Sequence, residues 1–502
     1  MCSLPENWAL TKFDEVVTFI TDYQANGSFA TLKENVKYYN AENYAVLVRL
    51  KDLRHNMTKI EDFVYTDKHG YNFLKKSSLR GGEILVANVG SVGTTILMPH
   101  TRRLSTLAPN MFIIFISDLI DKDYFVKYSQ SHYYWNEISR VSGGSSQPKM
   151  NKKEYRDIEF PLAPINEQKR IVAKLEKLLA KVETSQERLN KIPPILKRFR
   201  QSVLMQACSG ELTKKWREQN PDVEPAEELL KNIEEEITAL VKSKKIQKEN
   251  IPVIPETAKN GYVFPETWLP LKARYLCHHI TKGTTPKTDE LTDQGDIPYL
   301  KVYNIVNNKI DFEYKPQFVS KKIHEGFLGR SKVYPNDVLM NIVGPPLGKI
   351  AIVPDKYPEW NINQALAIFR PIKYLLPEFL YIVLSYDKTL YSVLPETKGI
   401  VGQSNISLEQ CRDLIIPLPS LKEQQEIIKK VNELYKIADR IEARYLKAKK
   451  YTDRLAQSIL AKAFRGELVS QDPNDEPASV LLEHIREEKV HTSSRKKVKV
   501  KV

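Results

Sequence analysis

Two short glycine-containing segments of this chain look, at first reading, able to hold a nucleotide. GPPLGKI at 344–350 places a lysine after two glycines, and GSVGTT at 90–95 is its counterpart without the lysine. A phosphate-binding P-loop needs four residues between its glycines, then Lys and Ser or Thr, and then a helix whose N-terminus faces the phosphate. Here three residues separate the two glycines, and an isoleucine follows the lysine. Both segments therefore predict tight turns between strands, which could face DNA, rather than an ATP site.

The sequence shows no pattern that would form a catalytic or metal centre. It has no glycine-rich cofactor loop after a strand, no Asn-Pro-Pro-aromatic motif of amino-methyltransferases, and no His/Cys cluster with metal-ligand spacing. His278 and His279 are adjacent, so on a strand they would point to opposite faces. The cysteines are too far apart for a zinc knuckle or a disulfide framework: Cys2, Cys208, Cys277 and Cys411. We therefore expect a chain that catalyses nothing alone and holds no cofactor or metal.

Polar and basic groups in flexible segments remain, and they predict binding rather than catalysis. GGSSQ at 143–147, GIVGQ at 399–403 and KGTTP at 282–286 combine glycines, which allow close backbone approach, with groups that bond phosphates and base edges. Side chains on two early strands could reach a groove. A plain solvated loop or strand is the alternative at each place. The candidate DNA-binding residues are Arg49, Lys51, Arg54, Ser91, Gly143, Gly144, Ser145, Gln147, Lys282, Thr284, Thr285, Lys301, Tyr303, Asn304, Lys349, Gly399 and Gln403.

The charge balance of the 502-residue chain favours a polyanionic partner. Its 76 Lys and Arg exceed its 62 Asp and Glu by 14, which leaves DNA, RNA and acidic membranes all open. The N-terminus lacks a basic flank with an apolar signal core, and no apolar run reaches about 18 residues. We therefore expect a soluble protein of the cytoplasm, with no membrane partner.

A long internal repeat must position the candidate groups. Both ends of the repeated unit recur, with a shift that drifts only from 252 to 260 residues, while the interiors differ. Such a duplication can place two similar surfaces about a pseudo-twofold axis, and it suits two recognition modules of different specificity. The matching segments include LPENW at 4–8 and FPETW at 264–268, PLAPINEQKRIV at 161–172 and PLPSLKEQQEII at 417–428, and QSVLMQACSGEL at 201–212 and QSILAKAFRGEL at 457–468.

Each half of the repeat mixes strands with helices, so the predicted fold class is α+β. Apolar and β-branched runs predict strands over 44–50, 83–90 and 110–116, followed by a helix over 123–139. The second half has the same order. Its predicted strands are 297–305, 337–344 and 364–372, and its helix is 377–394.

A heptad pattern after each globular part predicts two long helices that pack together as an antiparallel coiled coil. Nine of ten seam positions are apolar in each copy, against roughly four expected from a chain that is 42% hydrophobic. The alternative is that each seam covers only its own domain. The seam residues include Ile171, Leu175, Leu178, Val182 and Leu189 in the first copy and Ile427, Val431, Leu434, Ile441, Tyr445, Leu455 and Ile459 in the second.

Local chemistry predicts where these helices start and break. Ser420 and Glu423 fit a capping box, whereas Pro193 and Pro194 must break or kink the first seam. The second helix has lysines there and should run straight over 421–464. A charged helix is expected within 224–245, and the basic end SSRKKVKVKV is expected to be disordered.

Together these motifs resemble the specificity subunit of type I restriction-modification systems. The resemblance rests on the two PL-x-P/S-x-x-x-EQ helix entries, IPPILKRFRQSVL at 192–204, the two GEL endings, DEPASVLL at 475–482 and the paired glycine turns. It implies two target-recognition domains that each read half of a split DNA sequence, joined by helices that set their separation. The implied divisions are recognition domains at 1–158 and 263–413, helical spacers at 159–212 and 414–468, a linker at 213–262 and a C-terminal segment at 469–502.

The resemblance also implies partners that carry the chemistry. Two methyltransferase subunits with S-adenosylmethionine would dock on this chain, and restriction subunits using ATP and Mg would complete the nuclease, so that the chain directs adenine methylation or restriction of double-stranded DNA. Two other functions stay open on the residues alone. One is a self-contained methyltransferase or restriction enzyme, and the other is a coiled-coil scaffold that binds nucleic acid without reading its sequence.

Overall fold

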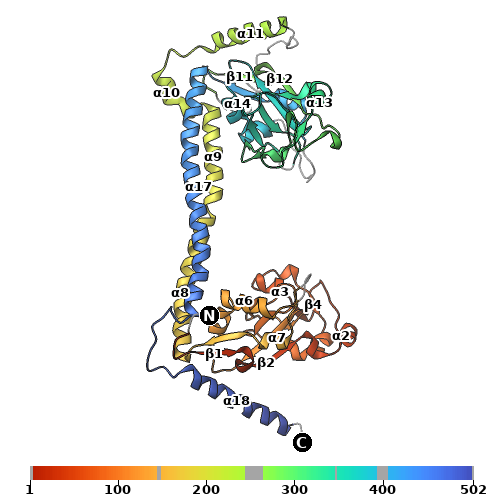
Figure 1. Ribbon diagram of the computed structural model, residues 1–502, viewed down its shortest axis with the longest axis vertical. Coiled ribbons are helices and arrows are strands. Elements are labelled where there is room, and N and C mark those ends of the chain that lie inside the picture. The colour runs from red at the N-terminus through yellow and green to blue at the C-terminus, as the bar shows by residue number, and fades with distance from the viewer. Residues whose placement is uncertain (1–3, 144–147, 244–263, 345–346, 393–404, 500–502) are drawn as a thin grey trace. The chain divides into compact units, whose positions relative to one another are not determined.

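The computed structural model describes residues 4–143, 148–243, 264–344, 347–392 and 405–499 (Figure 1). Its internal contacts divide the chain into two compact units. Unit 1 comprises Met1–Asn190 with Leu446–Val502, and unit 2 comprises Lys191–Tyr445. Each unit therefore combines one globular part with stretches of the long helices.

In the described residues of unit 1, two four-stranded sheets and one two-stranded sheet build the globular part. Residues of strand β6 alternate between two cores, because Ile84 and Val86 lie in the main cluster while Leu85 and Ala87 lie in the cluster between the sheets. Burial on both faces explains the unbroken apolar run. The sheets are β2 (Val17–Asp22), β9 (Met111–Ile116), β6 (Ile84–Ala87) and β7 (Thr95–Leu97); β4 (Tyr65–Thr66), β3 (Ala45–Val48), β8 (Ser105–Leu107) and β5 (Ser78–Leu79); and β1 (Ala9–Lys12) with β10 (Glu159–Leu162).

Unit 2 repeats this topology strand for strand. In both units the second sheet holds one parallel pair, β3 with β8 and β13 with β20. Unit 2 adds a hairpin of β14 (Ile305–Val306) and β15 (Lys309–Ile310). Its sheets are β12 (Cys277–Lys282), β21 (Leu366–Pro371), β18 (Val338–Asn341) and β19 (Ile350–Ile352); β16 (Phe318–Val319), β13 (Ile297–Leu300), β20 (Trp360–Ile362) and β17 (Lys332–Val333); and β11 (Leu269–Lys272) with β22 (Ile415–Leu418).

The α+β class is thus confirmed, and all six predicted strands are present, each shorter than its apolar run. The predicted single helices over 123–139 and 377–394 are wrong, because each is two helices. In unit 1 the Ser131 hydroxyl accepts from the Tyr134 amide at 3.3 Å and starts the second helix. The pairs are α5 (Lys122–Tyr128) and α6 (His132–Val141), and α14 (Pro377–Leu384) and α15 (Asp387–Tyr391).

Short helices complete the globular parts. In unit 1 they are α1 (Phe13–Val16), α2 (Phe29–Asn35), α3 (Leu50–Arg54), α4 (Lys68–Phe73) and α7 (Lys152–Arg156), and in unit 2 they are α10 (Lys214–Gln219), α12 (Ala273–Leu276), α13 (Lys321–Glu325) and α16 (Leu408–Asp413).

Three long helices form the coiled-coil part: α8 (Ile165–Asn190), α9 (Ile192–Ser209) and α17 (Leu421–Ala463). The predicted break is confirmed, since Pro193 and Pro194 lie in the first turn of α9. The second helix is continuous, as predicted. In unit 2, Arg200 pairs with Asp439 at 2.8 Å, and Lys430, which lies earlier on α17, donates to the carbonyl of Leu212, which lies later in the chain than Arg200, at 3.1 Å. Along the pair, residue numbers rise on α9 in the direction in which they fall on α17, so the two helices are antiparallel (Figure 1).

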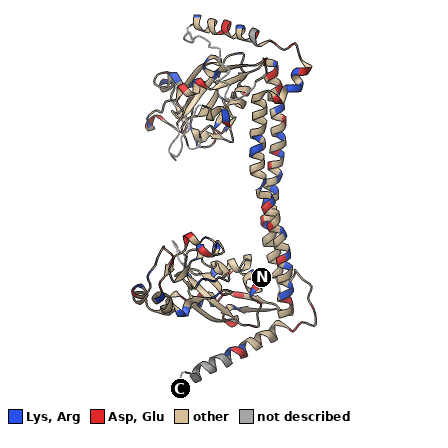
Figure 2. Cartoon of the chain, turned by 180° about the vertical axis from the view of Figure 1, so that it is seen from behind, with Lys and Arg blue, Asp and Glu red and all other residues tan. Residues whose placement is uncertain are grey.

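The predicted seam is buried where the helices pack on their own unit. Ile441 is the exception, because its side chain is 43% exposed. At this level the Arg200 guanidinium bonds Asp439 and Glu442, so ion pairs occupy the contact between the helices. Basic and acidic residues are interspersed along α17 (Figure 2). Buried seam residues are Ile171, Leu175, Val182, Ile427, Val431 and Ile459; Leu178, Leu434 and Leu455 are partly buried against the cores; Leu189 and Tyr445 are half-buried.

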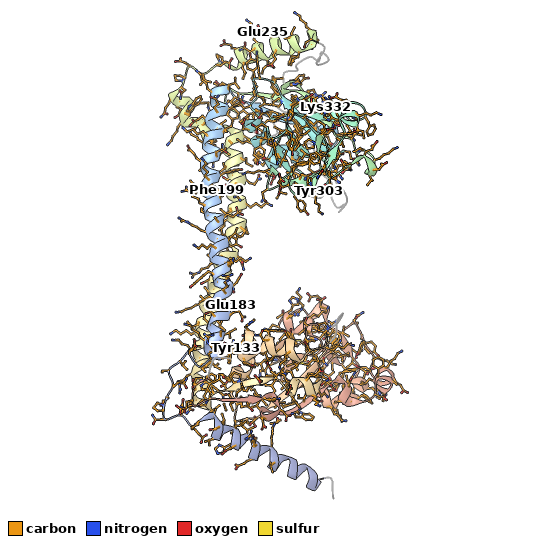
Figure 3. The ribbon with its side chains drawn as sticks, viewed as in Figure 1. Tyr133, Glu183, Phe199, Glu235, Tyr303 and Lys332 are labelled. Carbon is orange, nitrogen blue, oxygen red and sulfur yellow. The ribbon has the colours of Figure 1, made fainter. Side chains whose placement is uncertain are left out.

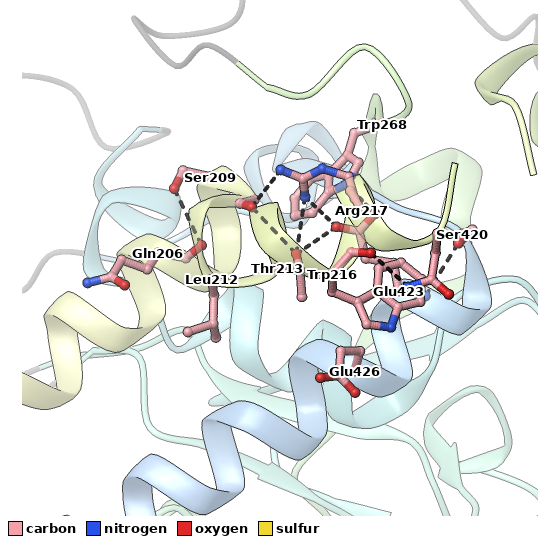
Figure 4. Close-up of polar contacts among 12 residues, drawn as sticks. Gln206, Ser209, Leu212, Thr213, Trp216, Arg217, Trp268, Ser420, Glu423 and Glu426 are labelled. Carbon is pink, nitrogen blue, oxygen red and sulfur yellow. Dashed lines mark hydrogen bonds and ion pairs between the residues drawn. The ribbon is translucent and has the colours of Figure 1, made fainter. Parts of the chain in front are cut away.

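A repeated clasp attaches each globular part to its helices. In unit 2 the Glu423 carboxylate, at the start of α17, accepts from Trp268 Nε1 at 2.9 Å and Thr213 Oγ1 at 2.6 Å and pairs with Arg217 (Figure 4). The predicted capping box is therefore only half correct. The Ser420 hydroxyl accepts from the Glu423 amide at 3.3 Å, but the carboxylate serves tertiary partners.

The unit 1 clasp uses the corresponding residues of the repeat. Glu167, near the start of α8, accepts from Trp8 Nε1 at 3.0 Å and from Gln471 Nε2 at 2.6 Å. Burial raises the pKa of Glu167, whose second donor is the neutral Gln471 and not an arginine like Arg217. LPENW and its copy FPETW thus supply the tryptophan of each clasp, and the EQ pairs of the helix entries supply its glutamate.

Two further helices follow the GEL segments. The charged helix expected within 224–245 is present as α11 (Ala226–Lys242). Helix α18 (Ala478–Lys499) packs into the unit 1 core through Leu481 and Ile485. Its backbone stays helical to Lys499, so the expected disorder of the basic end is wrong up to that residue, because the run continues a helix already anchored by the core. Among the described residues, no helix is both long and apolar enough to cross a membrane.

The ion pair that anchors α18 gives a pH-dependent prediction. Arg170 Nη2 lies 2.6 Å from Asp475 Oδ2, and this hydrogen bond lowers the pKa of the buried Asp475 carboxyl. A lowered folded pKa gives stability that is present above the unfolded pKa and lost as pH falls through the folded one. Asp475→Asn should therefore cost about 1–3 kcal/mol at pH 7 and progressively less below about pH 4. Urea unfolding across this pH range checks it, with the exposed Glu483→Gln as control.

Candidate nucleic-acid interface

Three of the predicted segments come together in unit 1. Arg54, at the end of α3, donates from Nη2 to the Ser91 hydroxyl at 3.0 Å, which joins the turn after β3 to the glycine turn after β6. The Gly90 amide donates to the Pro148 carbonyl at 3.2 Å, and Val89 forms a β-bridge with Lys149. The glycine turn is therefore also tied to the end of the predicted GGSSQ segment.

Unit 2 brings the equivalent three segments together with different side chains. Lys349 Nζ, in the glycine turn after β18, donates to the Ile305 carbonyl at 3.2 Å, in the segment after β13. Val343 forms a β-bridge with Asn405, and the Ile406 amide donates to the Ile342 carbonyl at 2.9 Å. The same juxtaposition thus occurs twice, once in each unit.

The segments that follow β3 and β13 are helical turns, whereas the sequence predicted that the strands continue there. Arg49, Lys51 and Arg54 were expected on a strand, but β3 ends at Val48 and the chain enters α3. Lys301, Tyr303 and Asn304 likewise follow β13, in a short 3-10 helix over Val302–Asn304. In each unit a buried polar side chain, Asp52 or Asn304, accepts a hydrogen bond from the backbone amide of the first residue after the strand, and this bond closes the turn. Lys51 and Arg54 are exposed, while Arg49, Lys301 and Tyr303 are half-buried. Figure 3 marks the position of Tyr303 on the globular part of unit 2.

Asn304 is corrected from a binding candidate to a structural residue. Its side chain is fully buried and donates to the Tyr314 carbonyl at 2.9 Å and the Asp311 carbonyl at 3.3 Å. Because the amide nitrogen and the amide oxygen of Asn304 are both engaged in internal hydrogen bonds, they are not available to a DNA base. Its neighbour Tyr303 keeps its hydroxyl near Gln317 Oε1 at 3.3 Å, and burial raises the pKa of that phenol, so it acts as a neutral group.

The remaining candidates are placed as follows. Lys282 ends β12 and is exposed. Thr284 lies on the loop that follows, where its hydroxyl accepts from Arg330 at 3.3 Å and its carbonyl from the Tyr299 hydroxyl at 2.8 Å. Thr285 is exposed beside it, and Gly143 is exposed beside Lys149. The other glycine-loop candidates lie outside the described residues: Gly144, Ser145, Gln147, Gly399 and Gln403.

Sequence reasoning missed three residues of this surface. Lys149 is exposed and bridges both Val89 and Gly143, and its place directly after GGSSQ and a proline was a usable signal. Tyr314 packs edge-on to Tyr303 with ring centroids 6.1 Å apart, and Lys315 Nζ lies 5.3 Å from the Tyr314 centroid. These two lie where the copies have diverged, so the repeat gave no signal for them.

Among the described residues, one group combines residue types that could bind a metal, but internal hydrogen bonds and ion pairs account for it. His324 Nε2 lies 3.1 Å from Glu359 Oε2, and its Nδ1 lies 3.1 Å from Asn361 Nδ2. Glu325, the third member, pairs with Lys332 at 2.5 Å. The described surface thus carries cations, hydroxyls and an aromatic pair. Groups of these kinds can contact phosphates and base edges.

Comparison with known proteins agrees with the repeated architecture. The family model of the type I restriction modification DNA specificity domain matches residues 5–193 and again 265–449. The chain is 31% identical over 379 residues to the EcoBI specificity subunit of Escherichia coli, covering 72% of this chain and 71% of that one. It is 27% identical to the EcoKI specificity subunit of Escherichia coli K12, covering 98% of each.

Solved structures show the same fold. A chain from a type I restriction-modification system aligns with a TM-score of 0.62 and 17% identity, over 93% of this chain and 100% of that one. The HsdS subunit of Thermoanaerobacter tengcongensis aligns with a TM-score of 0.51 and 18% identity, over 93% and 98%. With its two matched domains, the chain belongs to the family of type I restriction-modification DNA specificity subunits.

Proposed function

We propose that this chain is the DNA-recognition subunit of a type I restriction-modification complex and that it reads a double-stranded target in two parts. The observation that carries this is the repeated site, in which the same three segments meet in each unit. The cations differ between the copies, because unit 1 offers Arg54, which bonds Ser91, whereas unit 2 offers Lys349, which bonds the Ile305 carbonyl. Since direct readout depends on such groups, the two halves of the target should differ in sequence.

The chemistry would belong to partner subunits. We propose that two methyltransferase subunits, which carry S-adenosylmethionine, methylate adenine at sites this chain selects, and that restriction subunits using ATP and Mg cleave DNA. This chain would act in the cytoplasm as a non-catalytic component. The specificity-subunit names of its relatives, and the polar, cation-bearing sites of both units, support this division of roles.

Methylome sequencing tests the proposal. Cells that carry this chain with its methyltransferase should show one asymmetric motif, in which two different half-sites flank a fixed gap of unread bases. A continuous palindrome would contradict the two-part reading. Purified complex should also prefer this duplex over a scrambled one, and equal binding of both would favour a scaffold without sequence readout.

Arg54 gives a residue-level prediction for unit 1. Arg54→Gln removes an exposed guanidinium that Ser91 orients, and cognate binding should weaken by about 1–3 kcal/mol. The loss should fall on one half-site, so that substitutions in the other half-site cost the same as in the wild type. Fluorescence anisotropy with half-site variants measures this. Arg102→Gln removes an equal charge from another exposed position of unit 1 and serves as control; an equal loss there would contradict a local role.

A further inference from the structure

One buried side chain fixes the turn after the strand in each unit. In unit 1 the Asp52 carboxylate accepts from the Arg49 amide at 2.9 Å, and Asp52 is 3% exposed. In unit 2 the Asn304 side-chain oxygen accepts from the Lys301 amide at 2.9 Å, and Asn304 is fully buried. Both turns are therefore closed by the side chain of the residue three positions after the first one. This side chain is an aspartate in unit 1 and an asparagine in unit 2.

Asp52 and Asn304 differ in their other hydrogen-bond partners. Asp52 also accepts two bonds from its own turn's cation, Arg49 Nε at 3.0 Å and Nη2 at 2.8 Å. The Arg49 guanidinium is held further by the Asp62 carbonyl. Asn304 instead donates to two backbone carbonyls, and among the described residues Lys301 has no carboxylate partner.

The turn in unit 1 thus carries two arginines, one paired with a carboxylate and one bonded to a neutral hydroxyl. Arg49 is neutralised by a forked, charge-assisted contact, which holds the guanidinium against the turn. Arg54 is exposed and is oriented by the Ser91 hydroxyl of the glycine turn. Of these two arginines, Arg54 is the one that has no carboxylate partner among the described residues. The exposed Lys51 on the same turn lies 3.8 Å from Asp62 Oδ2.

We propose that Asp52 is a positioning residue with a second role: it holds the turn that carries Arg54, and it withholds Arg49 from the DNA backbone. The inference rests on the proposed function. A free guanidinium near a bound duplex would add a phosphate contact, which carries no sequence information and strengthens binding to any DNA. Asp52 therefore limits sequence-independent binding by unit 1.

The substitution Asp52→Asn separates the two roles. An asparagine oxygen still accepts from the Arg49 amide, and the same turn in unit 2 uses asparagine at this place. The variant loses the negative charge that neutralises Arg49. We expect the assembled complex to bind a scrambled duplex about threefold to tenfold more tightly at low salt, with a slope of log affinity against log salt about 0.9 steeper.

Binding to the methylome-defined cognate duplex and its scrambled counterpart, measured across a salt series, decides the matter. Asp52→Asn with Arg49→Gln should return the salt slope to the wild-type value, because the released charge is gone. An unchanged slope in Asp52→Asn, a gain that persists in the double variant, or a loss of cognate binding in Asp52→Asn each overturn the inference. If the wild type itself shows no preference for cognate DNA, the proposed function fails instead, so the two failures are distinguishable.

Discussion

Replacing Glu423 with alanine is expected to destabilise unit 2 by about 3–5 kcal/mol, because it leaves a buried positive charge without its partner. The Glu423 side chain is fully buried, and the Arg217 side chain is 17% exposed. The same carboxylate satisfies Trp268 Nε1 and Thr213 Oγ1. One substitution therefore removes the acceptor of three donors that come from two distant segments of the chain.

Urea unfolding and hydrogen exchange of the full-length chain measure this effect. Faster exchange should appear over 208–219, the segment that Arg217 and Thr213 hold against α17. Glu433→Ala, an exposed substitution on the same helix, is the control and should change the free energy of unfolding by less than about 0.5 kcal/mol. Equal effects of the two substitutions would show that the clasp contributes little.

The repeat supplies a second, internal comparison. Glu167 occupies the corresponding clasp of unit 1 but bonds neutral donors, Trp8 and Gln471. Burial raises the pKa of Glu167, which shows that its environment disfavours the charge. Glu167→Gln should therefore cost less than Glu423→Gln, because Glu423 bonds Arg217 directly, whereas the hydrogen-bond donors to Glu167 are neutral. The reverse order would contradict this account of the two clasps.

The features that the sequence predicted best are periodic or repeated. The α+β halves, the seam and the break at Pro193 follow from local patterns, because apolar spacing and proline geometry act over a few residues. Repetition helped further, since matching segments in two copies marked the frame. The glycine turns and the segments after the strands could be singled out as candidates for the same reason.

What escaped prediction depends on contacts between residues far apart in the chain. Glu423 fits a capping box locally, but Trp268, its partner, lies 155 residues away. Asn304 was expected to reach DNA, and only the fold reveals that loop carbonyls occupy it. The exposed seam position, Ile441, lies where Arg200 of the opposite helix forms ion pairs with Asp439 and Glu442. No local spacing encodes such partners, so sequence patterns find the segments of the site better than the roles of its side chains.

Gly466→Ala is expected to cost unit 1 about 2–5 kcal/mol, although it adds only one methyl group. Gly466 has φ +74°, a left-handed conformation that costs other L-residues about 1–2 kcal/mol. A Cβ there would lie 2.2 Å from Pro5 Cγ, and the proline ring is too rigid to yield. Overpacking of this kind adds roughly 1–3 kcal/mol. Thermal or urea unfolding of the full chain gives the measured cost.

Gly90→Ala separates the two contributions, because Gly90 has φ +77° and nothing within 4 Å of an added Cβ. It should cost only about 1–2 kcal/mol, the conformational part. Adding Pro5→Ala to Gly466→Ala removes the ring and should recover much of the steric part. Equal costs at Gly466 and Gly90, or no recovery in the double variant, would contradict a close fit of the GEL glycine against the N-terminal proline. Since Gly210 meets Pro265 in the same way, with 2.5 Å from Cβ to Cγ, Gly210→Ala should reproduce the effect in unit 2.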